Sequence, residues 1–145
     1  MKKKTNFTKL LSLCLCIVLI AAMALITCGC EDKQYQTIAL TEGKTYGVGA
    51  TEFAFSVIDL SGNETKVTVK TDKATVGEAL LDANIIAGDD DQYGLYVKAV
   101  NQLTLDYDTD KAYWAFYVDG GYASAGVDAT NIESGKVYSF KAEKA

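Results

Sequence analysis

The chain has 145 residues, room for one ordinary domain, and its 14 lysine and arginine residues against 19 aspartate and glutamate residues give a formal net charge of −5. Every one of the 14 cationic residues is lysine, and the sequence has neither histidine nor proline. These counts exclude Ser-His-Asp and Cys-His catalysis and histidine-ligated metals, and an acidic chain without arginine is a poor partner for nucleic acid.

Residues 1–29 are predicted to be a bacterial lipoprotein signal peptide. Four lysines lie in the first nine residues, ahead of an uncharged apolar run at 10–26 that ends in small residues. This order is typical of a secretory signal. Because the run is almost long enough to cross a bilayer, an uncleaved membrane anchor and plain secretion stay open as alternatives.

Cys30 is the predicted site of lipid attachment. A lipoprotein signal ends in a short apolar or small triplet before a cysteine, and Gly29 directly precedes Cys30. Cys28 is the alternative, because Leu25 lies three residues before it. The two other cysteines lie in the apolar run and leave with the signal, so no disulfide framework remains. We expect a lipid-anchored protein on the extracytoplasmic face of the cell membrane.

Residues 30–50 are predicted to be the lipidated cysteine and a flexible tether, and residues 51–145 the folded domain. Gly43, Gly47 and Gly49 favour neither helix nor strand in the tether. In the domain, residues 52–59 alternate between apolar and polar side chains, and residues 66–71 do so again after a Ser-Gly-Asn turn. The two segments predict a hairpin.

The clearest helix signal follows the hairpin. Thr75 with Glu78 three residues later forms a capping box, and apolar residues recur at helical spacing over 76–84. The acidic run Asp89, Asp90 and Asp91 then predicts irregular structure.

Three further strands are predicted, at residues 95–100, 112–118 and 137–142, where apolar residues alternate again. Trp114 and Phe116 share one side of the middle strand and are expected to fill the core. Strands on either side of one helix predict an α+β fold, a mixed or antiparallel curved sheet with one main α-helix packed on it.

Four segments carry a resemblance to a known family. They are TVGEALL at 75–81, YGLYV at 93–97, YWAFYVDG at 113–120 and GVD at 126–128. In this order they resemble a family of bacterial surface lipoproteins that is similar to the carboxy-terminal domain of transcobalamin and intrinsic factor. The resemblance covers residues 49–143. It implies a β-grasp-like fold, ligand binding without catalysis, and cobalamin as a candidate ligand.

The chain departs from the family pattern at two places. Gln102 stands where the family usually has glycine after Val-Asn, and Lys136 follows Gly135 where the family often has an acid. The first departure falls in a turn beside the expected ligand face.

Four tyrosines are the candidate ligand-binding residues. If Trp114 and Phe116 point inward, Tyr113 and Tyr117 point outward, and Tyr96 on another strand could join them with Tyr93. We predict that Tyr93, Tyr96, Tyr113 and Tyr117 form a shallow aromatic surface for a flat ligand. The alternative is that they are ordinary surface tyrosines.

The acidic residues at 106–110 resemble only the first half of a calcium loop. Lys111 stands where the loop needs glycine and Tyr117 where it needs glutamate, which favours a solvated acidic loop. We predict no metal ligands, no catalytic residues and no cofactor.

Taken together, these features predict a lipid-anchored extracytoplasmic binding module rather than an enzyme. It would capture a small molecule, with a corrinoid as one candidate, or a surface polymer. The alternative is a structural or adhesive module that engages a cell-surface protein through an exposed strand edge.

Overall fold

The computed structural model describes residues 33–145, and the chain from Tyr35 to Ala145 makes one compact unit. The predicted export signal and the lipidation candidates Cys28 and Cys30 lie outside the described residues. Within the described residues, no helix is long and apolar enough to cross a membrane.

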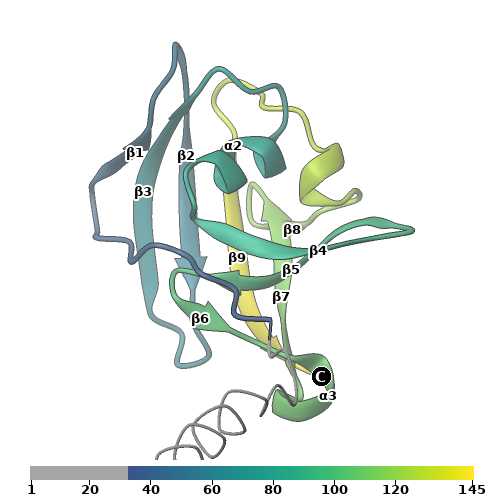
Figure 1. The fold of residues 1–145 in the computed structure, drawn as a ribbon. Coiled ribbons are helices and arrows are strands. Elements are labelled where there is room, and N and C mark those ends of the chain that lie inside the picture. The colour runs from purple at the N-terminus through teal and green to yellow at the C-terminus, as the bar shows by residue number, and fades with distance from the viewer. Residues whose placement is uncertain (1–32) are drawn as a thin grey trace, which may run out of the picture. The chain divides into compact units, whose positions relative to one another are not determined.

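Six strands form the larger sheet (Figure 1). They are β1 (Thr45–Gly47), β2 (Thr51–Ile58), β3 (Glu64–Thr71), β7 (Ala112–Val118), β8 (Gly121–Tyr122) and β9 (Val137–Lys144). Their order is β1-β3-β2-β9-β7-β8. The pairs β1–β3 and β2–β9 are parallel and the other neighbours are antiparallel, so the sheet is mixed.

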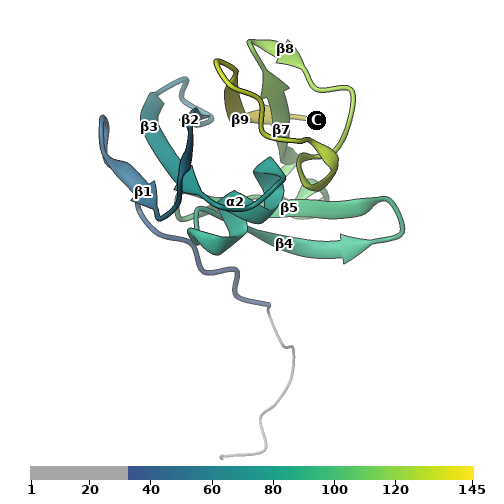
Figure 2. The ribbon, with the colours of Figure 1, turned by 90° about the horizontal axis from the view of Figure 1, so that it is seen from above.

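Three strands form a second, antiparallel sheet: β4 (Ile86–Asp91), β5 (Gly94–Val100) and β6 (Leu103–Thr104). The helical elements are short: α2 (Val76–Asp82), α3 (Tyr107–Asp110) and the 3-10 turn η1 (Val127–Ala129). Figure 2 shows α2 and strands β4 and β5 together on one side of the six-stranded sheet.

The core lies between these layers. Phe53, Phe55 and Val57 of β2 meet the aromatic side chains of β7 and β9, and Leu80 of α2 is fully buried with them. The ring centroids of Phe53 and Tyr138 lie 5.4 Å apart in an edge-to-face contact. Trp114 and Phe116 are buried, with 7% and 8% of their surfaces exposed, so their predicted place in the core is confirmed.

The predicted hairpin and helix are also confirmed. Strands β2 and β3 pair in register from Thr51 opposite Thr71 to Ile58 opposite Glu64. Helix α2 begins after Thr75, whose hydroxyl accepts the Glu78 N–H while the Glu78 carboxylate accepts the Thr75 N–H. The reciprocal pair satisfies donors that a helix start otherwise leaves free.

The predicted fold class, an α+β, β-grasp-like domain built on one sheet, is wrong. The described residues form a sheet-rich fold with two sheets, in which α2, with seven residues, is the longest helix. The main error concerns β4, whose acidic half was expected to be irregular. Asp89, Asp90 and Asp91 each pair with a residue of β5, so cross-strand pairing overrides their low strand propensity.

The segment before β2 differs from the predicted flexible tether. Its strand β1 pairs with β3, while Ile38 and Leu40 pack against the core. The Ile38 N–H donates to the Asn84 carbonyl over 2.9 Å. Glycine-rich composition alone did not reveal these partners, because they lie far along the chain.

Candidate functional site

The face of the six-stranded sheet that points away from α2 carries two of the predicted tyrosines. Side chains alternate along a strand, so burial of Trp114 and Phe116 in the core places Tyr113 and Tyr117 on the opposite side. The register sets Tyr113 opposite Glu143. We call this side the outer face. Its residues on β2, β3, β7, β8 and β9 are Glu52, Ala54, Ser56, Ile58, Glu64, Lys66, Thr68, Lys70, Tyr113, Ala115, Tyr117, Tyr122, Val137, Ser139, Lys141 and Glu143.

Glu143 gathers the tyrosines of this face. The Tyr113 hydroxyl donates to Glu143 Oε2 over 3.1 Å, and the Tyr117 hydroxyl donates to Glu143 Oε1. The ring centroid of Tyr122 lies 5.1 Å from that of Tyr117, and Tyr107 of α3 lies 6.2 Å from Tyr113. We call Tyr107, Tyr113, Tyr117, Tyr122 and Glu143 the tyrosine cluster.

The cluster changes the acidity of its phenols. The neighbouring Tyr122 hydroxyl and then the Glu143 carboxylate raise the pKa of Tyr113 to about 12. Hydrogen bonding to Glu143 raises the pKa of Tyr117 to about 12 as well. Both rings therefore remain neutral hydrogen-bond donors across the physiological pH range.

Two serines form a polar floor beside the cluster. Ser56 of β2 and Ser139 of β9 are paired in register, and only 4% and 8% of their surfaces are exposed. Neither hydroxyl has a hydrogen-bond partner within residues 33–145. Because every fully buried side-chain oxygen in that range does have a partner, these two hydroxyls must reach the surface of the outer face.

The floor continues into a pocket of about 400 Å³ at one end of the face. Its walls include Ala54, Thr68, Val137 and the loop at residues 134–136. Ala54 and Val137 lie two residues along their strands from Ser56 and Ser139, and Thr68 pairs with Ala54. The tyrosine cluster, the serine floor and this pocket thus form one continuous surface.

The other two predicted tyrosines lie on the three-stranded sheet. Tyr96 of β5 is on the side opposite the buried Val97, where Lys98 Nζ lies 4.7 Å from its ring centroid. Tyr93 is 87% exposed in the turn between β4 and β5. The structure brings Tyr113 and Tyr117 together, but Tyr93 and Tyr96 make none of the contacts of the cluster.

Several residues of the outer face were missed in the sequence. Glu143 could have been found, because alternation from the buried Phe140 places Lys141 and Glu143 outward. Tyr122 follows the Gly120-Gly121 turn and pairs back onto Tyr117. The two serines gave no signal, because small polar residues on a strand do not show which strand lies beside them.

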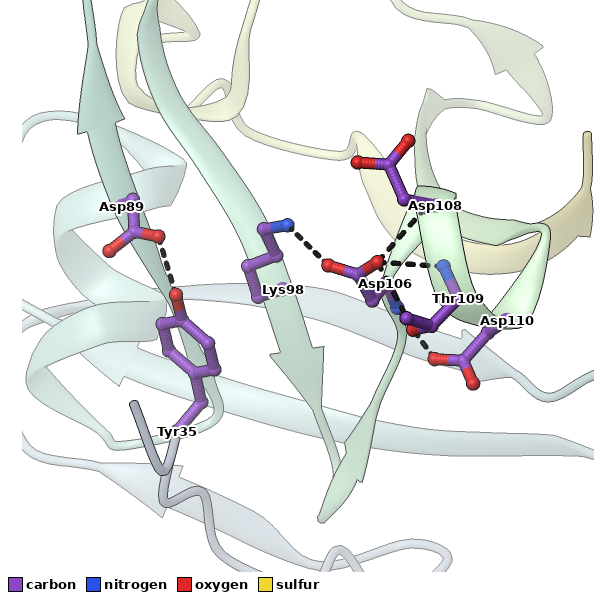
Figure 3. A network of polar contacts seen from close by, with 7 residues as sticks. All are labelled: Tyr35, Asp89, Lys98, Asp106, Asp108, Thr109 and Asp110. Carbon is purple, nitrogen blue, oxygen red and sulfur yellow. Dashed lines mark hydrogen bonds and ion pairs between the residues drawn. The ribbon is translucent and has the colours of Figure 1, made fainter. Parts of the chain in front are cut away.

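A separate polar network lies near α3 and β5 (Figure 3). Asp106 Oδ1 accepts the Asp108 and Thr109 N–H groups and Oδ2 accepts from Lys98 Nζ over 3.1 Å. The Thr109 N–H, then Lys98 and the Thr109 hydroxyl, lower the pKa of Asp106 to about 2. Asp110 in turn accepts the Asp106 N–H.

The same network accounts for the acidic residues at 106–110 that resemble half a calcium loop. Asp106 and Asp110 act as caps of α3 and its neighbouring backbone. Across residues 33–145, no three His, Cys, Asp or Glu side chains gather in a way that could hold a metal ion. Asp89 belongs to the same region and accepts the Tyr35 hydroxyl, which ties the start of the domain to β4.

Strands β7, β8 and β9 of the outer face lie in a region that is similar to a known family. Residues 73–144 match the sequence model of a family described as "Domain of unknown function (DUF4430)". No curated protein matches the sequence significantly.

Solved structures share the fold. One is a protein of Ruminococcus gnavus ATCC 29149 with a suggested role in metal binding, which is 23% identical over 66% of this chain and 99% of that one, with a TM-score of 0.62. Another is haptocorrin in complex with Cbi, which is 16% identical over 65% of this chain and 25% of that one, with a TM-score of 0.50. This chain therefore corresponds to about a quarter of haptocorrin. At these identities the likeness shows the fold alone.

Proposed function

We propose that this chain is a lipid-anchored binding module of the extracytoplasmic membrane face. The lipoprotein signal predicted at residues 1–29 supports the anchor. The match of residues 73–144 to the DUF4430 family and the fold shared with haptocorrin support binding. The module captures a small molecule or a surface polymer on the outer face of its six-stranded sheet. The observation that carries this proposal is the tyrosine cluster. Glu143 fixes two aromatic rings in place, so little conformational entropy is lost when a ligand packs against them.

The chemistry of the cluster favours binding over catalysis. A general acid or base works best when its pKa lies near the operating pH, and Tyr113 and Tyr117 have pKa values of about 12. A corrinoid is one candidate ligand, supported by the fold shared with haptocorrin, which was solved with Cbi bound.

The alternative adhesive function has less support. The edge strands of the six-stranded sheet, β1 and β8, have only three and two residues. The longer edge strand β4 carries Asp89, Asp90 and Asp91, and charge on an edge discourages the addition of another strand.

Titration calorimetry on the full chain in detergent micelles tests the binding function. The panel contains cobinamide, other small molecules and cell-wall fragments. We expect a saturable isotherm for at least one of them, weakened tenfold or more by Y113A/Y117A. The variant Y93A/Y96A removes two tyrosines of the other sheet and should leave the affinity unchanged. An isotherm that both double variants weaken equally, or no isotherm at all, would contradict the proposal.

The lipid anchor has its own test. Intact mass of the membrane-extracted chain should match a protein that begins at a diacylated Cys30. The variant C30A should accumulate with its signal peptide still attached. If C30A is processed normally and C28A is not, the lipid belongs on Cys28. If neither variant changes processing, the chain is not lipidated.

A further inference from the structure

The charges of the outer face balance. Lys66 lies 3.6 Å from Glu64, Lys70 lies 3.8 Å from Glu52, and Lys141 lies 3.8 Å from Glu143. Three lysines and three glutamates therefore leave the face with no net charge, although the whole chain carries −5. A phosphate, sulfate or carboxylate polymer would find no unpaired cation here, and a cationic ligand would find no unpaired acid. Charge complementarity thus selects a neutral ligand.

The aromatic part of the face offers ring surface rather than a closed cavity. Tyr107 and Tyr122 are 51% and 63% exposed, while the hydroxyls of Tyr113 and Tyr117 donate hydrogen bonds to Glu143 on the same face. Aromatic rings that are fixed in this way pack well against the C–H faces of sugar rings, because both surfaces are flat and apolar.

The floor of the face needs a ligand rich in hydroxyl groups. The hydroxyls of Ser56 and Ser139 lack partners within the described residues, and each can both donate and accept. A flat apolar ligand would cover them and leave them unsatisfied, which opposes binding. A polyhydroxylated ligand would satisfy both.

The length of the surface suits a chain rather than one compact molecule. Along β9 the outward positions run from Glu143 beside Tyr113, through Ser139 beside Tyr117, to Val137 at the pocket. These six residue steps span about 20 Å at the rise of a β-strand. The pocket of about 400 Å³ gives one end of such a chain a place to settle.

We propose that the outer face binds a neutral glycan chain along β9, with its sugar rings against the tyrosine cluster and its hydroxyls on Ser56, Ser139 and Glu143. The proposal rests on the binding function proposed above and names the class of ligand.

The experiment is calorimetry of the full chain in detergent micelles with cellohexaose, chitohexaose and linear mannohexaose. A sulfated hexasaccharide from heparin and cobinamide serve as comparison ligands. We expect saturable binding of at least one neutral hexasaccharide and none of the sulfated one. The variant Y113A/Y117A should weaken that binding tenfold or more, and S56A/S139A about threefold or more.

Control variants distinguish loss of the binding site from loss of the fold. The matched variant Y93A/Y96A should leave hexasaccharide binding unchanged. If Y113A/Y117A does not fold, Y122A removes an exposed ring of the same cluster and should still weaken binding severalfold. Binding that survives Y122A in a folded protein overturns the proposed site.

The outcomes also distinguish this inference from the function beneath it. If no neutral hexasaccharide binds but cobinamide or another small molecule does, and Y113A/Y117A abolishes that binding, the glycan proposal fails while the binding function stands. If the sulfated hexasaccharide binds as tightly as the neutral ones, the charge argument is wrong and the glycan proposal fails again. If the folded chain binds nothing in either panel, both proposals fail.

Discussion

Glu143 accepts hydrogen bonds from Tyr113 and Tyr117. This acceptor raises the pKa of Tyr117, and the Tyr122 hydroxyl and then Glu143 raise the pKa of Tyr113. Both pKa values are about 12, against 10.0 for a free tyrosine. A pKa raised on folding stabilises the fold at every pH below the unfolded value. This contribution is lost as the pH rises from 10 through about 12.

The variant E143Q should therefore lower the pKa of Tyr117 toward 10, because the amide is a weaker acceptor than the carboxylate. The pKa of Tyr113 should fall less, because the Tyr122 hydroxyl, the larger cause of its shift, remains in place. Tyrosinate absorbance during an alkaline titration measures this shift. Tyr35 is an internal control, since its own pKa of about 12 arises from hydrogen bonding to Asp89 and should not change. The expected result for E143Q is that Tyr117 ionises at a lower pH than in the parent protein, and an unaltered titration would contradict it.

Gln102 gives a second prediction at the scale of one residue. The hairpin between β5 and β6 turns through Asn101 and Gln102, both in the left-handed region with φ of 50° and 64°. Asparagine tolerates this conformation and glutamine does so poorly, whereas glycine adopts it without strain. We expect Q102G to raise the free energy of unfolding by about 1 kcal/mol.

Thermal or urea unfolding of Q102G can be compared with N101G, which makes the same change one residue earlier. Asn101 Oδ1 accepts the Leu40 N–H over 2.6 Å, so N101G should destabilise the chain despite its freer backbone. Equal losses of stability in both variants would show that the backbone at Gln102 is not strained.

At the scale of elements, α2 meets η1 through a contact that only glycine permits. A Cβ atom on the buried Gly77 would lie 2.7 Å from Asp128 Cα and 2.8 Å from Asp128 N. Alanine normally stabilises a helix interior relative to glycine by about 1 kcal/mol. At Gly77 the clash outweighs this gain and makes alanine destabilising, because neither backbone atom of Asp128 can move without shifting η1.

The variant G77A should therefore lower the free energy of unfolding by about 1 to 3 kcal/mol, the usual range for overpacking. Its control is D82A at the exposed end of the same helix, which should change stability by no more than about 0.5 kcal/mol. Urea titration measures both variants. A G77A protein more stable than the parent would mean that α2 is free to move away from η1.

Elements with a strong local pattern were predicted from the sequence, and elements made by distant pairing were not. The capping box of Thr75 and Glu78 and the alternation around Trp114 are local, and both are confirmed. Strands β1 and β4 form because β3 and β5 supply their hydrogen bonds, since the glycines around β1 and the three aspartates of β4 do not by themselves favour a strand. The same distinction applies to the candidate site. Alternation along one strand predicted that Tyr113 and Tyr117 point outward. Glu143 lies beside them because of the register between β7 and β9, which the local sequence does not show.

At the scale of the whole molecule, the chain before β2 is attached to the rest of the domain by several hydrogen bonds. Tyr35 donates to Asp89, Thr37 Oγ1 accepts the Gln102 N–H over 2.7 Å, and Leu40 donates to Asn101. These bonds fasten residues 35–40 to the three-stranded sheet and its turn.

Limited trypsin digestion of the full chain in detergent tests this attachment. We expect cleavage after Lys33 well before cleavage after Lys44, because the Lys44 carbonyl accepts the Thr68 N–H over 3.0 Å and the Lys44 N–H donates to Thr41. Mass spectrometry identifies the fragment that begins at Gln34. Early cleavage after Lys44 would instead indicate a loose tether.

Because residues 35–40 are attached to the three-stranded sheet, they limit the length of the linker between the lipid and the domain. If Cys30 carries the lipid, only five peptide steps separate it from Tyr35, which reach at most about 18 Å when fully extended. A flexible linker that ended at residue 50 would have allowed the domain to move several times farther from the bilayer. The protein would then sample only the layer of the envelope next to the bilayer, and a ligand would have to penetrate to that layer to be captured.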